Sequence, residues 1–253
     1  MAGGGPAGAS LVARTMDVLG AFGDRHRRLA LTELARRAGL PPPTALRIVR
    51  QLIACGALTR AADGTYAVGR RMWDIGLLAP IETDLKDVAA PFLHDLYAAT
   101  RATVHIAVRD DDRALYLDVL AGSVSVPVVS RAGSLLPLYT TGVGKVLLAD
   151  APWDVVHRVL ASLTRITPYT ITSPGLLQRQ LESCRHDGYA TTSEEMTLGA
   201  CSVAVPVRAE RRVVAAIGVV VPSFDRDSRR LTSGLQVAAQ GISRELARRQ
   251  AYG

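Results

Sequence analysis

The spacing of apolar residues changes twice between residues 32 and 68. It first fits a short helix ending near Gly39, then a second helix, and then two short strands around an Asp63-Gly64 turn. The buried face of the second helix is predicted from four apolar residues at i, i+3, i+4 and i+7: Ala45, Ile48, Val49 and Leu52. This order of elements predicts a winged helix-turn-helix domain.

A further helix is expected upstream, as a third wall of the same core. Ser10 is placed to cap the start of that helix. Its apolar residues are Leu11, Val12, Met16, Leu19 and Phe22. Residues 1–9, rich in Gly and Ala, are expected to form a disordered tail, so the winged helix-turn-helix domain is assigned to residues 10–70.

The polar face of the second helix carries the candidate chemistry of this domain. In a winged helix-turn-helix, that helix enters the DNA major groove, where side chains contact phosphates and base edges. We expect DNA contacts from Thr32, Thr44, Arg47, Arg50, Gln51 and Arg60. The alternative is a small helical domain with a solvated basic face.

The distribution of charge favours DNA binding. Residues 1–70 contain ten arginines, no lysine and four acidic residues, a net charge of +6. The remaining 183 residues have 20 basic and 19 acidic residues, a net charge of +1. An ordinary solvated surface would spread the excess more evenly, whereas phosphate neutralisation requires it on the DNA-binding domain.

The rest of the chain predicts a mainly antiparallel α+β domain. Strands are expected at residues 103–109, 113–120, 124–130, 201–207 and 213–221. Helices are expected at 69–79, 83–99, 142–149, 152–161, 174–186 and 227–249. Ser173 is placed to cap the helix that Gly188 ends. We therefore assign a linker helix to residues 71–83 and a second domain to residues 84–250.

Length and composition limit the classes of protein to which the chain can belong. A chain of 253 residues with 48 % hydrophobic content suits two domains. It has no apolar run near the eighteen or so residues of a membrane span, and we expect neither a signal peptide nor a membrane partner. The three cysteines, Cys55, Cys184 and Cys201, are too few and too far apart for a disulfide framework or a CxxC metal site, which fits a reducing cytoplasm.

Motifs in both predicted domains resemble those of IclR-type transcriptional regulators, over about residues 10 to 249. In the first domain the matching segments are LTELARRAGLP (31–41) and DGTYAVG (63–69). In the second they are TVHIAV (103–108), LPLYTTGVGK (136–145), GYA (188–190), EE (194–195) and the stretch 199–207. The resemblance rests on the order and spacing of these segments.

The resemblance implies a winged helix, a helical linker used in dimerisation, and a GAF-like C-terminal domain that binds a small effector, often an organic acid. It implies homodimers or homotetramers on palindromic double-stranded operators, and a repressor whose operator affinity the effector controls. The loop 140–144 would present backbone N–H groups and a helix dipole to a carboxylate. The implied effector residues are Thr140, Thr141, Gly142, Val143, Thr192, Ser202, Gly218 and Val220. The alternative is that Gly142 and Gly144 serve only a tight turn.

The chain departs from the family pattern in two places. Gly218 and Val220 stand where polar side chains are common, which predicts a more apolar pocket or a larger ligand. Pro42 and Pro43 stand where a basic residue and a serine are common. A helix cap and a phosphate contact are therefore expected to be absent or moved to Thr44.

The sequence does not favour an enzyme, and no catalytic residue, metal or cofactor is expected. The segment 142–145 lacks the spacing of a Walker A motif, and the five histidines never recur at the close helical spacing of a zinc site. His105 is interpreted as a hydrogen-bonded structural residue. Glu194 and Glu195, if in a strand, would point to opposite faces. A ligand-independent architectural DNA-binding dimer, with a filled core in its second domain, is the other alternative.

Overall fold

The computed structural model describes residues 10–23, 26–76, 83–121, 129–210, 212–224 and 228–252. The expected tail at residues 1–9 lies outside the described residues. The chain divides into two compact units, Met1–Ile81 and Glu82–Gly253, and each is considered by itself.

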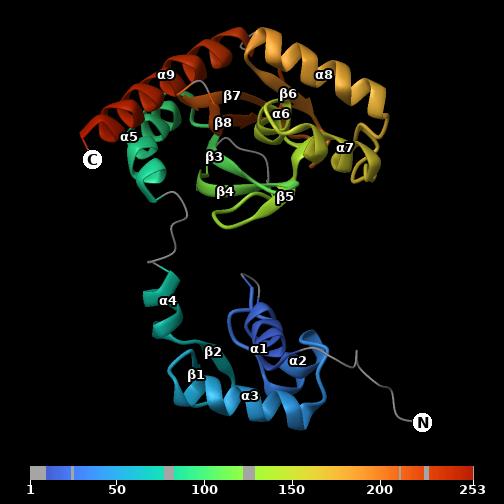
Figure 1. The fold of residues 1–253 in the computed structure, drawn as a ribbon, viewed down its shortest axis with the longest axis vertical. Coiled ribbons are helices and arrows are strands. Elements are labelled where there is room, and N and C mark those ends of the chain that lie inside the picture. The colour runs from blue at the N-terminus through green and yellow to red at the C-terminus, as the bar shows by residue number, and fades with distance from the viewer. Residues whose placement is uncertain are drawn as a thin grey trace. The chain divides into compact units, whose positions relative to one another are not determined.

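The first unit is a winged helix-turn-helix, as the sequence predicts (Figure 1). Its elements are α1 (Leu11–Gly20), α2 (Leu31–Arg37), α3 (Pro42–Ala54), β1 (Leu58–Arg60), β2 (Tyr66–Val68) and α4 (Arg70–Gly76). β1 and β2 pair antiparallel around the predicted Asp63-Gly64 turn. Between α2 and α3 the chain turns at Gly39, whose φ of +63° is unfavourable for other residues.

The buried face of α3 is the predicted one, since Ala45, Ile48, Val49 and Leu52 are all buried. The expectation for α1 is only partly correct. Leu19 and Phe22 pack against the core, but Leu11, Val12 and Met16 are 51 %, 72 % and 60 % exposed. The small core contacts the last turn of α1, where Val18 is fully buried, so the first turns extend beyond it.

The helices α1 and α3 differ in whether a side chain caps their N-termini. The Ser10 side chain accepts a hydrogen bond from the Ala13 N–H at 3.1 Å, as expected for a cap of α1. At α3 the cap position is Pro41 and no side chain caps the helix. The capping hydroxyl is therefore absent, and Thr44 does not replace it.

Within its described residues, the second unit is an α+β domain built on a six-stranded antiparallel sheet, with strand order β5-β4-β3-β8-β7-β6. The strands are β3 (Thr103–Asp110), β4 (Arg113–Leu120), β5 (Leu135–Pro137), β6 (Ala190–Ser193), β7 (Cys201–Ala209) and β8 (Arg212–Val221). The helices are α5 (Thr83–Thr100), the 3-10 turn η1 (Leu138–Thr140), α6 (Gly142–Ala149), α7 (Trp153–Ala161), α8 (Pro174–Asp187) and α9 (Ser228–Tyr252).

Three details differ from the sequence expectation. The two edge strands β5 and β6 were not expected, because three or four residues are too few to display an alternating pattern. Of the strand expected at 124–130, residues 124–128 lie outside the described residues, and Val129 and Ser130 are not in a strand. Ser173 occupies the cap position of α8 but its side chain makes no capping bond, whereas Gly188 ends that helix as expected.

The sheet separates two hydrophobic cores, because side chains alternate between its faces. One face packs against α5 and α9, and the other packs against α6, α7 and α8 (Figure 1). On β7, for example, Val203 and Val205 point to the first core while Ala204 points to the second. The face toward α6 therefore receives every second residue of each strand, and this face carries the candidate ligand site.

Candidate functional sites

The first unit presents the predicted DNA-contacting residues mostly at its surface. On α3, Arg47, Arg50 and Gln51 are exposed and lie opposite the buried face, while Thr44 is half-buried in the first turn. This places their side chains where a major groove would meet the helix. Thr32 is exposed at the start of α2.

Arg60 is also exposed, but it has a partner within the fold. Its guanidinium carbon lies 5.8 Å from the centre of the Tyr66 ring, in a cation–π contact between β1 and β2. At the tip of the same hairpin, Asp63 accepts hydrogen bonds from the Thr65 N–H and hydroxyl at 2.9 and 2.6 Å. The hairpin is thus organised before any DNA contact is made.

Two of the arginines that give this unit its positive charge are paired on α2. The Glu33 carboxylate accepts hydrogen bonds from Arg36 at 2.6 and 2.9 Å and from Arg37 at 2.6 Å. These bonds hold the pKa of Glu33 at about 2, so it remains charged over the whole physiological range. Arg47 and Arg50, in contrast, have no ion pair within the described residues.

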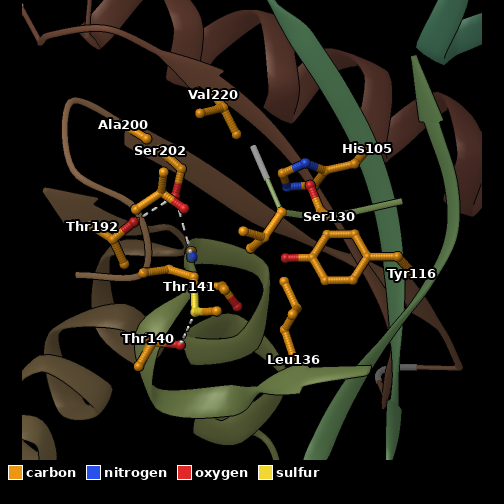
Figure 2. Close-up of a pocket in the computed structure, with 14 residues that line it drawn as sticks. His105, Tyr116, Ser130, Leu136, Thr140, Thr141, Thr192, Ala200, Ser202 and Val220 are labelled. Carbon is orange, nitrogen blue, oxygen red and sulfur yellow. Dashed lines mark hydrogen bonds between the residues drawn. The ribbon is translucent and has the colours of Figure 1, made fainter. Parts of the chain in front are cut away.

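The second unit contains a small open cavity of about 40 Å³ between the sheet and the start of α6 (Figure 2). Six of the eight residues that the family resemblance implied for the effector line it: Thr140, Thr141, Gly142, Thr192, Ser202 and Val220. The structure thus brings together residues from η1, α6, β6, β7 and β8 that are up to eighty positions apart in the sequence.

Hydroxyl groups and a backbone N–H form one end of the cavity, as Figure 2 shows. The Thr141 side chain caps α6 by accepting a hydrogen bond from the Gly144 N–H at 3.1 Å. The Gly142 N–H donates to the Ser202 hydroxyl at 3.3 Å, and that hydroxyl bonds Thr192 at 2.6 Å. This end therefore combines a helix N-terminus with three hydroxyl groups, the arrangement that proteins use for anions.

The other two implied residues, Val143 and Gly218, are not among the residues that line the cavity. Val143 is fully buried in the core behind it. Gly144 also has an internal role, because a Cβ there would lie 2.3 Å from the Leu138 carbonyl oxygen. For Gly144 the structure thus favours the turn alternative, whereas Gly142 does face the cavity.

Sequence reasoning did not assign eight further lining residues to the site: His105, Tyr116, Val129, Ser130, Leu136, Met196, Thr197 and Ala200. His105, Tyr116, Ser202 and Val220 belong to different strands but point to the same face of the sheet. Strand alternation alone could have indicated that His105 faces away from the α5–α9 core, because its neighbours Val104 and Ile106 face it.

His105 differs from the sequence interpretation. It is 3 % exposed, and its Nδ1 atom has no hydrogen-bond partner among the described residues, so it is not a hydrogen-bonded structural histidine. It meets the Tyr116 ring edge to face, with ring centres 5.1 Å apart. Burial lowers the pKa of His105 to about 4 and raises that of Tyr116, so both groups are neutral near pH 7.

A buried ion pair supports the cavity from behind α6. The Lys145 ammonium donates to both Glu195 carboxylate oxygens, at 2.6 and 2.8 Å, and to Gln180 at 2.7 Å. Burial lowers the pKa of Lys145 and raises that of Glu195, while their mutual attraction opposes both shifts. Glu195 directly precedes Met196 and Thr197, which line the cavity, so the pair connects α6 to this loop.

Glu194 and Glu195 lie just beyond β6 rather than in a strand, and they have separate partners. Glu194 accepts from the Gly199 N–H at 2.7 Å, and its φ is +56°. No group of three or more His, Cys, Asp or Glu side chains within the described residues could hold a metal ion. In the described part of the chain, no helix combines the length and apolar character needed to cross a bilayer.

A basic winged helix followed by a separate α+β unit with a polar-ended cavity defines a transcription regulator with DNA-binding and regulatory domains. The chain belongs to the IclR family: residues 11–62 match the IclR helix-turn-helix domain, and residues 80–244 match the bacterial transcriptional regulator IclR C-terminal domain.

Individual relatives align with nearly the whole chain. The transcriptional regulator KdgR of Escherichia coli is 29 % identical over 248 residues, covering 95 % of this chain and 94 % of its own. The DNA-binding transcriptional repressor YiaJ of Escherichia coli is 29 % identical over 252 residues, covering 95 % and 89 %. A crystal structure of an IclR homologue from Microbacterium hydrocarbonoxydans, complexed with 4-hydroxybenzoate, is 31 % identical with a TM-score of 0.89, covering 94 % and 99 %.

Proposed function

We propose that this chain is a repressor that binds a palindromic operator as a dimer or tetramer, and that a small organic acid in the cavity controls its operator affinity. One observation carries the proposal: the N-terminus of α6 opens into a lined cavity beside three hydroxyl groups. Repression is supported by the relative named as a repressor, and an aromatic acid by the Microbacterium homologue bound to 4-hydroxybenzoate.

The geometry at Gly142 supports a carboxylate as the bound group. Its N–H reaches the Ser202 hydroxyl at 3.3 Å, longer than the usual 2.9–3.0 Å or so for such a bond. A carboxylate oxygen would be a stronger acceptor for this N–H and would lie at the positive end of the helix dipole. The cavity also argues against the architectural alternative, which requires a filled core.

Replacing Gly142 by Val tests the site. A Cβ at this position would lie 2.7 Å from the Ser202 hydroxyl, so the larger side chain should close the polar end of the cavity. We expect Gly142→Val to bind operator DNA like the native chain but to lose its response to 4-hydroxybenzoate. Ala161→Val, which adds bulk at an exposed position on α7, is the matched control and should respond normally.

The measurement is a titration of operator DNA, selected from random duplexes, with and without the acid. Coupling between effector and DNA is reciprocal and typically about 1–3 kcal/mol, so the acid should change operator affinity about 5- to 150-fold in the native chain. A Gly142→Val protein that still responds would place the effector elsewhere. A native chain that ignores a broad panel of metabolites would support the architectural alternative.

For DNA contact we propose the six residues Thr32, Thr44, Arg47, Arg50, Gln51 and Arg60, with α3 in the major groove. The relatives are named as transcriptional regulators, which supports a role without catalysis. If the partner is bacterial chromosomal DNA, the protein acts in the cytoplasm. For the domains we propose a DNA-binding domain at 10–70, a linker at 71–83 and an effector domain at 84–250.

Dimerisation is supported by apolar residues that the first unit leaves uncovered. Leu11, Val12 and Met16 of α1 and Trp73 and Ile75 of α4 are at least half exposed. Met72 of α4 packs partly on the core of its own unit, and residues 77–82 of the linker lie outside the described residues. Light scattering at micromolar concentration should show at least a dimer, and Ile75→Glu should weaken it. A monomer that binds its operator tightly would contradict this assignment.

A further inference from the structure

The wall of the cavity contains a buried polar group that the fold leaves unsatisfied. His105 is 3 % exposed and lines the cavity, yet its Nδ1 atom has no hydrogen-bond partner in the described part of the chain. Folded proteins pair nearly all such atoms, and an exception indicates local strain, a functional role or a bound water or ion. Its ring contact with Tyr116 supplies packing but no hydrogen bond to Nδ1.

The adjacent strand makes room for this imidazole. Gly218 pairs directly with His105 in the sheet, and a Cβ at Gly218 would lie 2.8 Å from His105 Nε2 and 3.1 Å from Val143 Cγ1. Any side chain at position 218 would therefore displace the ring. Position 218 therefore carries no polar side chain, and the His105 imidazole from the neighbouring strand β3 occupies the space instead.

His105 lies across the cavity from the start of α6. Figure 2 shows His105 and Tyr116 on one side and Thr141, Thr192 and Ser202 on the other. The strands that carry His105 and Ser202, β3 and β7, are separated by β8, so their backbones are about 10 Å apart at the usual strand spacing. The other lining residues are Val129, Ser130, Leu136, Thr140, Gly142, Met196, Thr197, Ala200 and Val220.

The cavity is suited to one charged group at most. Among the described residues that line it, none is Arg, Lys, Asp or Glu. The N-terminus of α6 can compensate one carboxylate. Because burial keeps the imidazole neutral, with a pKa of about 4, the opposite end offers a hydrogen bond but no charge.

We infer that His105 determines ligand specificity: the cavity selects a monocarboxylic acid that carries a hydroxyl group at its opposite end, and the His105 imidazole hydrogen-bonds that hydroxyl. The inference rests on the proposed function, because it takes the start of α6 as the carboxylate site. A second carboxylate at the His105 end would be buried without a counter-charge and is disfavoured. The same acid without the hydroxyl would leave the imidazole unpaired.

The test uses the full chain and three aromatic acids of similar shape: 4-hydroxybenzoate, benzoate and terephthalate. Calorimetry of the native protein should show 4-hydroxybenzoate binding about tenfold more tightly than benzoate, the effect of one well-formed hydrogen bond, and terephthalate more weakly than both. In His105→Phe, which keeps the ring, the preference should disappear while benzoate affinity stays within about threefold. The matched control is His94→Phe, at an exposed position on α5, which should retain the preference.

Each outcome has a distinct meaning. Equal binding of benzoate and 4-hydroxybenzoate by the native chain, or a preference that survives in His105→Phe, overturns the inference. Binding of none of the three acids overturns the inference, whereas the organic-acid effector is decided by the broader metabolite panel described above. Binding with the expected preference but without any effect on operator affinity supports the inference and removes the proposed regulation. If His105→Phe does not fold, the imidazole ¹⁵N signal of His105 in the native chain should move with 4-hydroxybenzoate and not with benzoate.

Discussion

The two units of this chain place their polar chemistry in opposite environments. In the winged helix a small apolar core supports α3, and the arginines proposed to contact DNA, Arg47 and Arg50, are exposed. In the second unit the polar groups around the ligand site are inside: Thr140 and Lys145 are at most 1 % exposed and His105 is 3 % exposed.

This difference decides what a substitution does. An exposed side chain keeps its hydration in the folded state, so its loss should change binding and leave folding nearly intact. A buried polar group has lost its hydration and depends on its partners, so removing a partner should destabilise the fold as well as the site. The predictions below test this contrast, beginning with the largest effect.

The largest effect is expected from Lys145→Met. The substitution leaves the buried Glu195 carboxylate without its ion-pair partner, which typically destabilises a protein by about 3–5 kcal/mol. Urea denaturation followed by circular dichroism should show this loss in the transition of the second unit. The double variant Lys145→Met with Glu195→Leu is the control, because replacing both charges by apolar groups should recover most of the stability. A single variant as stable as the native chain would mean that the pair contributes little.

The next effect is a loss of stability in acid that originates at His105. Its folded-state pKa of about 4 lies below the usual value of 6.5, so the unfolded chain binds a proton more readily. The stabilisation is therefore complete above about pH 6.5 and is lost as the pH falls toward 4. It amounts to about 3 kcal/mol.

The comparison of native and His105→Phe proteins isolates this effect, since all other titrating groups are shared. Urea denaturation at pH 7 and pH 4 measures how far the free energy of unfolding falls between the two. This fall should be smaller for His105→Phe than for the native chain, by about 3 kcal/mol. His94→Phe should behave like the native chain, because His94 is exposed. If the free energy of unfolding fell equally with pH in the native and His105→Phe proteins, the link between this histidine and acid lability would be refuted.

In the first unit, Arg47→Ala should weaken operator binding by about 1–3 kcal/mol if Arg47 contacts a base. Its unfolding free energy should change by no more than about 0.5 kcal/mol, since the side chain is exposed. Gel shifts on the operator and on a scrambled duplex measure the specific part. Unchanged operator affinity would exclude Arg47 from the interface, and a large loss of stability would contradict the contrast between the units.

The same contrast explains which parts of the molecule could be predicted from the sequence. The buried face of α3 repeats within thirteen residues, so local periodicity was enough to define it and, by exclusion, the exposed face with Arg47. The cavity depends on strand register instead. That His105 pairs with Gly218, or that Lys145 meets Glu195 fifty positions away, follows from tertiary structure and has no local signal.

The family resemblance predicted some of the cavity residues that have no local sequence signal. It supplied Thr140 to Gly142, Thr192 and Ser202 as residues of one site, although their contact could not be inferred from spacing. It did not supply His105 or Tyr116. The departure at Gly218 was visible in the sequence, but its cause is steric: the imidazole from β3 fills the space that a side chain there would need.

The smallest effect on folding is expected from Glu33→Gln. Its ion pairs with Arg36 and Arg37 are on the surface of α2, where solvent and salt screen them, so the urea midpoint should not change measurably. DNA binding should nevertheless become tighter, because the variant removes a negative charge from the domain that meets phosphates. Asp154→Asn is the control: Asp154 forms a similar surface pair with Arg158 but belongs to the second unit, and its loss should affect neither property. Gel shifts at two salt concentrations measure the effect, which should shrink at the higher one. Weaker DNA binding by Glu33→Gln would instead show that Glu33 positions Arg36 and Arg37 for contact with DNA.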